Sequence, residues 1–247
     1  MTHNDSRLAS LDCLAGIVIL AGGASNRMGA PKATLTLPSG ERLLDYHVRH
    51  ALDLNAPIFI ADNGRGFRSN LAFSGQQSQF AVVYIADYGS GDAVCASAEI
   101  KNGGALVAIE SGLQQLQGIE KQDFQKSDTS TNNSLSWVMV ISCDSLIPAT
   151  DLWQKLQPSM LQVKNNGSTK TKVICLTDEQ HLYPLLGLYQ LSVEPALKAY
   201  IDSGQRRVMT FIKPLMQTVP LSPRWQPLTN FNTPVEFERA CLGLNDS

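Results

Sequence analysis

Short apolar runs alternate with helical stretches along the chain, and this alternation constrains its fold more than any other feature. The runs are continuous and rich in β-branched residues: GIVILA (16–21), IFIA (Ile58–Ala61), FAVVYIAD (80–87), WVMVIS (Trp137–Ser142), TKVICLT (171–177) and YPLLGLY (183–189). Such runs are typical of strands that are buried on both faces. Strands alternating with helices predict an α/β fold, with a mostly parallel twisted sheet and helices on both faces.

The segments between the runs carry the helical patterns. A helix is predicted from Leu43 until Pro57 stops it, and further helices are predicted at 105–116, 151–156, 194–204, 206–215 and from about Pro234. The remaining segments are predicted to be a short strand and turn (33–41), a surface excursion (62–79), a long loop (88–103) and a mobile polar insertion (117–136). Because crossovers are right-handed, the carboxyl ends of parallel strands share one rim, where ligands bind.

Composition limits the classes of partner. The 247 residues are 43% hydrophobic, enough for a sizeable core, and a net charge of −2 gives no general attraction to nucleic acid or membranes. The five cysteines show no metal-ligand spacing, and we see neither a signal peptide nor an apolar run that could span a bilayer. We therefore expect a cytoplasmic protein with a local site for any anion.

A glycine-rich segment follows the first strand directly. Gly22 and Gly23 let backbone N–H groups and an anion approach closely, while Arg27 and Lys32 supply a forked and a point-like positive charge. The spacing matches neither a Walker A loop nor a dinucleotide-binding fingerprint. The alternative is a tight turn with two solvated cations. The basic pair at this distance from a buried strand favours a phosphate site.

Two aspartates follow predicted strands at the same rim. Asp87 ends the third strand and Asp144 follows the fourth, so both could hold a hydrated Mg²⁺ that bridges phosphate oxygens. The alternative for each is a cap on the next turn or helix. The cationic loop nearby favours metal binding for Asp144.

Other polar residues give weaker signals. His47 and His50 have helical spacing but no carboxylate partners in the pattern, which predicts a solvated helix face. Arg206 and Arg207 lie between two predicted helices. They could bind a phosphate, or Arg206 could interact with the end of the preceding helix.

These residues resemble known sequence motifs. LAGGASNRMGAPK (20–32) resembles the LAGG-x-S-x-RMG-x-x-K signature of nucleotidyltransferases. SGQRRVMTF (203–211), NFNTPVEF (230–237) and PLLGLY (184–189) resemble segments of molybdenum cofactor guanylyltransferases. The matches run in family order from Gly16 to Phe237, so the resemblance covers nearly the whole chain.

The resemblance implies a Rossmann-like fold of the nucleotidyltransferase type. It also implies transfer of GMP from MgGTP to molybdopterin, giving the guanine dinucleotide cofactor and pyrophosphate, with Mg²⁺ as cofactor. One domain (1–247) would have a nucleotide-binding part at about 16–150 and an acceptor-side part at about 151–242. GTP and molybdopterin would be the ligands, and molybdoenzymes or their chaperones remain open as protein partners.

The resemblance also implies roles for single residues. The residues that read guanine and cradle the phosphates would be Leu20, Ala21, Gly22 and Gly23, and Gly22 favours guanine because related cytidylyltransferases show LAAG. Lys32 would contact the phosphates, Asp87 the nucleotide and Asp144 the magnesium ion. Asn230 and Asn232 would lie on the acceptor side.

Catalysis would then consist of positioning and charge neutralisation, because a phosphate nucleophile is already anionic and needs no general base. Lys32 and Arg27 would counter the charge on pyrophosphate, and Asp144 would hold the metal. We expect Lys32 on a loop that is exposed when no nucleotide is bound.

Three positions depart from the family pattern and concern guanine and acceptor contacts more than phosphate or metal contacts. Ala61 replaces an Asn of N-x-N-R, Ala105 replaces the proline of G-P-L-A-G, and Leu146 replaces a proline after Asp144. Two alternatives therefore stay open: nucleotidyl transfer to another phosphorylated acceptor, or a catalytically silent homologue that binds GTP or molybdopterin.

Overall fold

A computed structural model describes residues 13–23, 25–71, 82–86, 103–124 and 136–245. Its centre is a seven-stranded sheet with the order β3-β2-β1-β4-β6-β5-β7. The strands are β1 (Leu14–Leu20), β2 (Ile58–Ala61), β3 (Val82–Ile85), β4 (Trp137–Ser142), β5 (Val173–Thr177), β6 (Leu182–Gln190) and β7 (Met216–Pro220).

Six of these strands run in one direction. β1 is parallel to β2 and to β4, with Ile17 opposite Ile58 on one side and Met139 on the other. β6 alone is antiparallel to both of its neighbours, β4 and β5, while β5 and β7 are parallel. The mostly parallel sheet predicted from the sequence is confirmed, and β1 and β4 end side by side at its centre.

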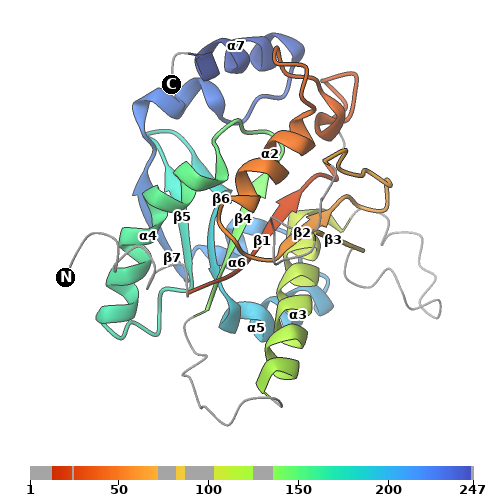
Figure 1. Cartoon of the computed structure of the whole chain (residues 1–247). Coiled ribbons are helices and arrows are strands. Elements are labelled where there is room, and N and C mark those ends of the chain that lie inside the picture. The colour runs from red at the N-terminus through yellow and green to blue at the C-terminus, as the bar shows by residue number, and fades with distance from the viewer. Residues whose placement is uncertain (1–12, 24, 72–81, 87–102, 125–135, 246–247) are drawn as a thin grey trace.

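Helices cover both faces of the sheet (Figure 1). The α-helices are α2 (Leu43–Leu52), α3 (Gly104–Phe124), α4 (Ala149–Asn165), α5 (Glu194–Asp202), α6 (Val208–Ile212) and α7 (Pro234–Asn245). The described residues also contain the 3-10 turns η1 (Lys32–Thr34), η4 (Leu191–Val193) and η5 (Pro223–Leu228). α2, α4 and α7 share one face, and α3, α5 and α6 share the other.

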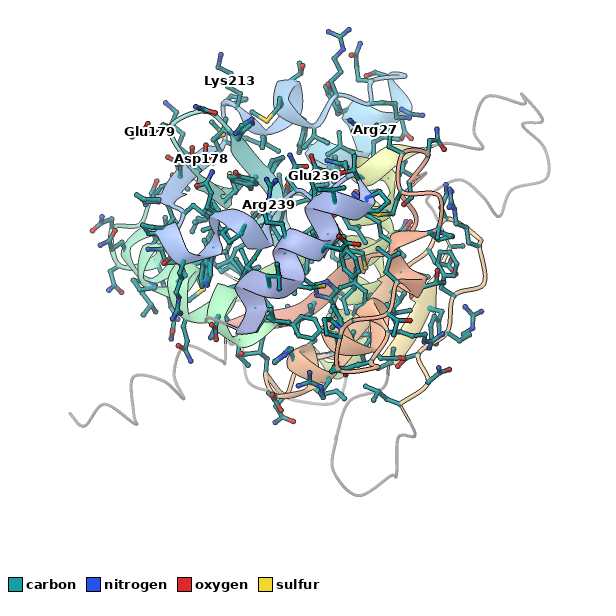
Figure 2. The ribbon with its side chains drawn as sticks, turned by 90° about the horizontal axis from the view of Figure 1, so that it is seen from above. Arg27, Asp178, Glu179, Lys213, Glu236 and Arg239 are labelled. Atoms are coloured by element: carbon teal, nitrogen blue, oxygen red, sulfur yellow. The ribbon has the colours of Figure 1, made fainter. Side chains whose placement is uncertain are left out.

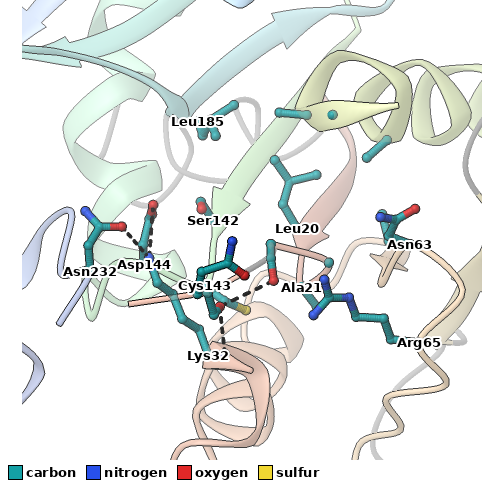
Figure 3. Close-up of a pocket in the computed structure, with 18 of the residues that line it drawn as sticks. Leu20, Ala21, Lys32, Asn63, Arg65, Ser142, Cys143, Asp144, Leu185 and Asn232 are labelled. Atoms are coloured by element: carbon teal, nitrogen blue, oxygen red, sulfur yellow. Dashed lines mark hydrogen bonds and ion pairs between the residues drawn. The ribbon is translucent and has the colours of Figure 1, made fainter. Parts of the chain in front are cut away.

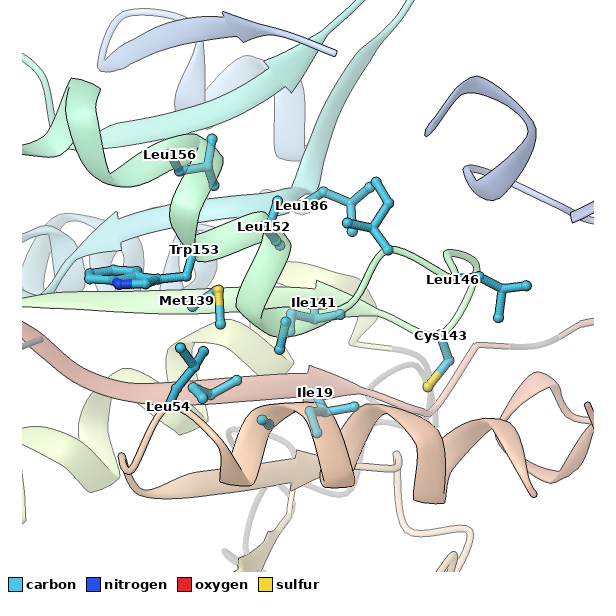
Figure 4. Close-up of a cluster of buried hydrophobic side chains, with 14 of the residues drawn as sticks. Ile19, Leu54, Met139, Ile141, Cys143, Leu146, Leu152, Trp153, Leu156 and Leu186 are labelled. Atoms are coloured by element: carbon cyan, nitrogen blue, oxygen red, sulfur yellow. The ribbon is translucent and has the colours of Figure 1, made fainter. Parts of the chain in front are cut away.

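Each face has its own core because successive side chains of a strand point in opposite directions. Ile17 and Ile19 belong to the core under α2 and α4, whereas Val18 belongs to the core under α3. Figure 4 shows the first core, where Trp153 of α4 packs over Met139 of β4. Continuous apolar strands are therefore required, which explains why the sequence runs lack alternation.

Several elements differ from their predicted bounds. α3 continues from the predicted end at Leu116 to Phe124, through the first part of the polar segment. α4 is 17 residues long, and the helix predicted at 206–215 is reduced to Val208–Ile212. β7 was not predicted. The segment 33–41 is not a regular strand. Its first residues belong to η1, and Thr36 forms an isolated bridge with Arg42.

The prediction of a solvated face for His47 is wrong. His47 is fully buried, and burial lowers its pKa to about 4. The loop after β4 covers this side of α2, where the Tyr46 hydroxyl donates to the Leu146 carbonyl oxygen at 2.8 Å. His50 is half-buried.

A pair of acidic side chains lies on the face of the sheet that is covered by α3 and α5. Glu110 of α3 is fully buried and Glu194, at the start of α5, is nearly so. Burial, and then the adjacent Glu194 carboxyl, raises the pKa of Glu110 to about 8. The α3–α5 contact thus contains a carboxyl group that favours its neutral form.

Within the described residues, no helix combines the length and apolarity needed to cross a membrane.

Candidate functional site

A pocket of about 640 Å³ opens where β1 and β4 end, a size typical of small-molecule sites. It receives residues from both halves of the chain. The lining residues are Leu20, Ala21, Gly22, Gly23, Ser25, Asn26, Arg27, Lys32, Ala61, Asn63, Arg65, Gly104, Ala105, Ala108, Ser142, Cys143, Asp144, Leu185 and Asn232. The backbone N–H of Cys143 donates to the Leu20 carbonyl oxygen at 3.1 Å, which ties the two strand ends together.

The glycine-rich loop after β1 is anchored at its far end. Met28 is buried in the core, and Gly29 has a φ of 76°, a left-handed conformation that favours glycine. The N–H of Met28 donates to the Ser25 carbonyl oxygen at 2.9 Å, and the N–H of Lys32 donates to the Ser25 hydroxyl at 3.3 Å. These contacts fold the loop back so that Lys32 faces the end of β4.

Lys32 is not on an exposed loop, and that expectation is wrong. Its side chain is only 13% exposed, and its Nζ donates to the Asn232 Oδ1 at 2.9 Å (Figure 3). The same Nζ lies 3.8 Å from the Asp144 carboxylate and over the Phe231 ring. Burial lowers the pKa of Lys32, and the Asp144 carboxylate opposes that shift only in part.

Asp144 follows β4 directly and reaches the pocket. Its side chain is 28% exposed, and its nearest cation is Lys32. α4 begins at Ala149 after Pro148 with no side-chain cap, so Asp144 does not cap that helix. The neighbouring Cys143 thiol is buried, which raises its pKa to about 12 and makes it a poor nucleophile at neutral pH.

Asn232 is held by the start of α7. Thr233 and Glu236 form a capping box, because the N–H of Glu236 donates to the Thr233 hydroxyl and the Glu236 carboxylate accepts from the N–H groups of Thr233 and Asn232. The Asn232 Nδ2 donates to the Asn230 carbonyl oxygen at 2.9 Å, which leaves Oδ1 for Lys32. The hydrogen bonds from the N–H groups of Asn232 and Thr233 lower the pKa of Glu236, and the positive charge of Arg27 lowers it by a smaller amount.

Arg27 and Glu236 lie on the same side of the molecule, as Figure 2 shows. Arg27 is exposed and lines the pocket. Three of the described lining residues, Arg27, Lys32 and Arg65, are cationic, and Asp144 is the acidic one. The first residues of α3 also line the pocket, so the positive end of that helix dipole faces the same space. The site is therefore suited to an anion that carries several charges.

The reversed strand β6 brings a further side chain to the rim. Because β6 is antiparallel to β4, its beginning lies beside the end of β4, with Leu186 opposite Ile141. Leu185 consequently lines the pocket, above Ser142 in Figure 3. The segment PLLGLY thus reaches the pocket with its first residues.

The structure brings most of the predicted site residues together and leaves their roles as predictions. The residues gathered at the pocket are Leu20, Ala21, Gly22, Gly23, Arg27, Lys32, Asp144 and Asn232. Asn230 is outside this lining and instead accepts from Asn232. Asp87 lies outside the described residues. Arg206 donates to the Ile201 carbonyl oxygen at 2.6 Å, which is the helix-end contact considered above.

Two polar pocket residues after β2 were not predicted from the sequence. Asn63 and Arg65 line the wall beside Gly22, within a segment that we interpreted as a surface excursion. The available signal was the sequence DNGRG (62–66), because an aspartate two residues before a glycine is typical of a tight turn. Such a turn directly after a buried strand must lie at the ligand-binding rim.

Comparisons with known proteins agree with this geometry. Residues 17–219 match the family described as "MobA-like NTP transferase domain". The chain is 25% identical over 221 residues to a molybdenum cofactor guanylyltransferase from Vibrio atlanticus (strain LGP32), with 89% of this chain and 92% of that protein covered.

Solved structures with 14% sequence identity share the fold. Molybdopterin-guanine dinucleotide biosynthesis protein A from Archaeoglobus fulgidus gives a TM-score of 0.60, with 94% of this chain and 100% of that chain covered. The 2-C-methyl-D-erythritol 4-phosphate cytidylyltransferase of Francisella tularensis gives a TM-score of 0.52, with 92% and 98% covered. Since the family match spans most of the sequence and all of the pocket residues except Asn232, this chain belongs to the MobA-like NTP transferase family and is a nucleotidyltransferase.

Proposed function

We propose that the chain transfers GMP from GTP to the molybdopterin cofactor, with release of pyrophosphate. The observation that carries this proposal is the position of Lys32, whose ammonium group lies between Asn232 and Asp144 in a pocket walled by the glycine-rich loop. The name of the Vibrio relative supports guanine as the base and the molybdenum cofactor as the acceptor.

In the proposed reaction, a terminal phosphate oxygen of the acceptor forms a bond to the α-phosphorus of GTP. The bond between that phosphorus and the bridging oxygen to the β-phosphate breaks, and its electrons leave with pyrophosphate. Lys32 exchanges its hydrogen bond to Asn232 for one to a phosphate oxygen, and Arg27 neutralises further charge. Preorganised cations act strongly here because charge moves onto the leaving group.

A divalent cation fits the donor set at Asp144. Mg²⁺ in phosphate-transfer sites is typically held by one or two carboxylates together with substrate phosphates and water. No group of three or more His, Cys, Asp or Glu side chains within the described residues could hold a metal, so phosphate oxygens would complete the coordination. When bound, the ion would polarise the phosphate oxygens. Asp144 would hold the ion, and Lys32, 3.8 Å from the Asp144 carboxylate, partly neutralises that carboxylate in the absence of a metal.

The remaining assignments follow the family resemblance. The residues proposed to hold the nucleotide are Leu20, Ala21, Gly22, Gly23 and Asp87, within a nucleotide-binding part at about 16–150. Asn232, supported by Asn230, would face the acceptor from a part at about 151–242. Leu185 lines the same pocket.

A thermal-shift series with nucleotides tests the choice of base. We expect GTP with Mg²⁺ to raise the Tm more than CTP, ATP or UTP, because a ligand that binds only the native state stabilises it by about 2.7 kcal/mol at a hundredfold excess over Kd. A larger shift with CTP would remove the guanylyl assignment while leaving nucleotidyl transfer intact.

Pyrophosphate release with labelled GTP then tests the acceptor. Transfer of label to molybdopterin, with none to a sugar phosphate, is the expected result. Transfer only to the sugar phosphate would replace the acceptor, and GTP binding without pyrophosphate release would identify a silent homologue.

A further inference from the structure

The turn after β2 is locked from within by one buried carboxylate. Asp62 is 5% exposed, and it accepts hydrogen bonds from the N–H of Gly64 at 3.0 Å and the N–H of Phe67 at 2.7 Å. Its carbonyl oxygen accepts from the N–H of Arg65 at 3.2 Å. We call residues 62–67 the Asp62 turn. Since its hydrogen bonds are internal, its shape does not depend on a ligand.

The Asp62 turn sits directly against the glycine-rich loop. A Cβ atom added at Gly22 would lie 2.7 Å from the Asn63 Cβ and 2.9 Å from the Asn63 nitrogen, closer than real contacts allow. At Gly23 the same atom would meet nothing within 4 Å. The two loops therefore pack as one wall, and Gly22 fixes their separation.

Arg65 projects from this wall into the pocket. Figure 3 shows its guanidinium group turned back toward Ala21. Within the described part of the chain, this guanidinium has neither an ion-pair nor a hydrogen-bond partner. Arg68, three residues later, pairs with Asp62 at 3.6 Å, stacks on the Tyr84 ring at 4.1 Å and lies outside the pocket. The Asp62 turn thus uses Arg68 in its own contacts and leaves Arg65 available to a ligand.

The position of Arg65 indicates which part of the ligand it meets. In Figure 3 it lies at the opposite end of the pocket from Lys32 and Asp144, where phosphate chemistry is proposed. The pocket lining also contains small apolar side chains, Ala21, Ala61, Ala105 and Ala108, which suit the flat face of a base. On the proposed function, a nucleotide whose α-phosphate is at Lys32 extends its base toward the Asp62 turn.

We propose that Arg65 is a specificity-determining residue that selects guanine by donating two hydrogen bonds to O6 and N7 of the base. Both atoms are acceptors and match the forked donors of a guanidinium group. Adenine has an N6 amino donor in place of O6 and cannot complete the pair. Gly22 then contributes to selectivity through the placement of the turn rather than through contact with the base.

The test compares dissociation constants for GTP, ITP and ATP with Mg²⁺ in the wild type, Arg65→Ala, Arg65→Lys and the control Arg68→Ala. Wild-type preference for GTP over ATP tests the proposed function separately from this inference. Arg65→Ala should then reduce the GTP preference by about fivefold to 140-fold, since a bidentate pair contributes roughly 1–3 kcal/mol of discrimination. ITP keeps O6 and N7 and should weaken in parallel with GTP.

The other variants separate base reading from charge and from turn stability. Arg65→Lys keeps the charge but loses the fork, so it should not restore selectivity. Arg68→Ala should keep the wild-type GTP preference. An equal loss of affinity for all three nucleotides, a raised acceptor KM with unchanged nucleotide selectivity, or full selectivity in Arg65→Lys would each overturn the inference.

Discussion

Lys32 is a cation whose charge the folded protein disfavours. Its pKa lies below the ordinary lysine value because burial outweighs the attraction of Asp144. The charged side chain therefore destabilises the fold at neutral pH, and this contribution disappears as the pH rises through the lowered pKa toward 10.5. The charge of Lys32 therefore does not stabilise the fold, and the role proposed for this residue is in ligand binding.

The variant Lys32→Met tests whether the charge of Lys32 destabilises the fold. The apo variant should melt no lower than the wild type at pH 7 and up to about 3 °C higher, since 1 kcal/mol shifts the Tm of a domain of this size by roughly 2–4 °C. The difference should shrink above the pKa of Lys32. Turnover should fall on the order of a hundredfold, as for other lost transition-state contacts.

The pH profile gives a second readout for Lys32. The alkaline limb of kcat/KM should lie below 10.5 in the wild type and be absent in Lys32→Arg, because arginine stays protonated. The role assigned to Lys32 would be wrong if Lys32→Met turned over like the wild type.

Single site residues could be predicted where the neighbouring sequence shows their position at the end of a strand. Gly22, Lys32 and Asp144 follow buried strands in the sequence, and strand ends share a rim. The burial of Lys32 was not predictable because its partner Asn232 comes from the other end of the chain. Arg65 was missed because DNGRG indicates a turn but does not show that Asp62 is buried and that Arg65 lines the pocket.

Helix α3 shows how closely a helix can approach the sheet. Gly112 lies over β1, and a Cβ atom there would be 2.4 Å from a Val18 methyl group. Gly118, in the same helix, is exposed and has nothing within 4 Å. The same substitution should therefore have opposite effects at the two positions.

Gly118→Ala should raise the free energy of unfolding by about 1 kcal/mol, the gain in helix propensity. Gly112→Ala has the same gain but should lower the free energy of unfolding overall, because overpacking against a stiff valine costs about 1–3 kcal/mol. Urea denaturation of both variants measures this. Equal stabilisation at both positions would show that α3 does not touch β1 as described.

Strands were predicted better than connections, for physical reasons. Trp137–Ser142 and Ile58–Ala61 are continuous apolar runs because they are covered on both faces. β7, with the sequence MQTVP, is an edge strand with polar residues and a terminal proline, so its pattern is weak. The reversal of β6 has no sequence signal, because strand direction depends on pairing and not on side-chain pattern.

Glu110 links the stability of the whole molecule to pH. Its raised folded pKa of about 8, compared with 4.5 for an ordinary glutamate, means that the native state keeps a proton that the unfolded state releases. This stabilisation is fully present below pH 4.5 and is lost as the pH rises through about 8. The α3–α5 contact should weaken under alkaline conditions.

Glu110→Gln imitates the protonated form and tests this effect. The variant should melt close to the wild type at pH 5 and above it at pH 9, so its Tm should depend less on pH. Glu238→Gln, at an exposed position on α7, is the control and should follow the wild type. A wild-type Tm that does not fall between pH 5 and pH 9 relative to Glu110→Gln would contradict the buried carboxyl pair.

The hydrogen bond between Lys32 and Asn232 also has a consequence for the order in which the protein forms. It joins residues 200 positions apart, and contacts of such high sequence separation form only after the intervening chain has been made and folded. A growing polypeptide that has completed β1 and its glycine-rich loop still lacks one wall of the pocket. Full nucleotide affinity should therefore arise late in biosynthesis, once the segment before α7 is in place.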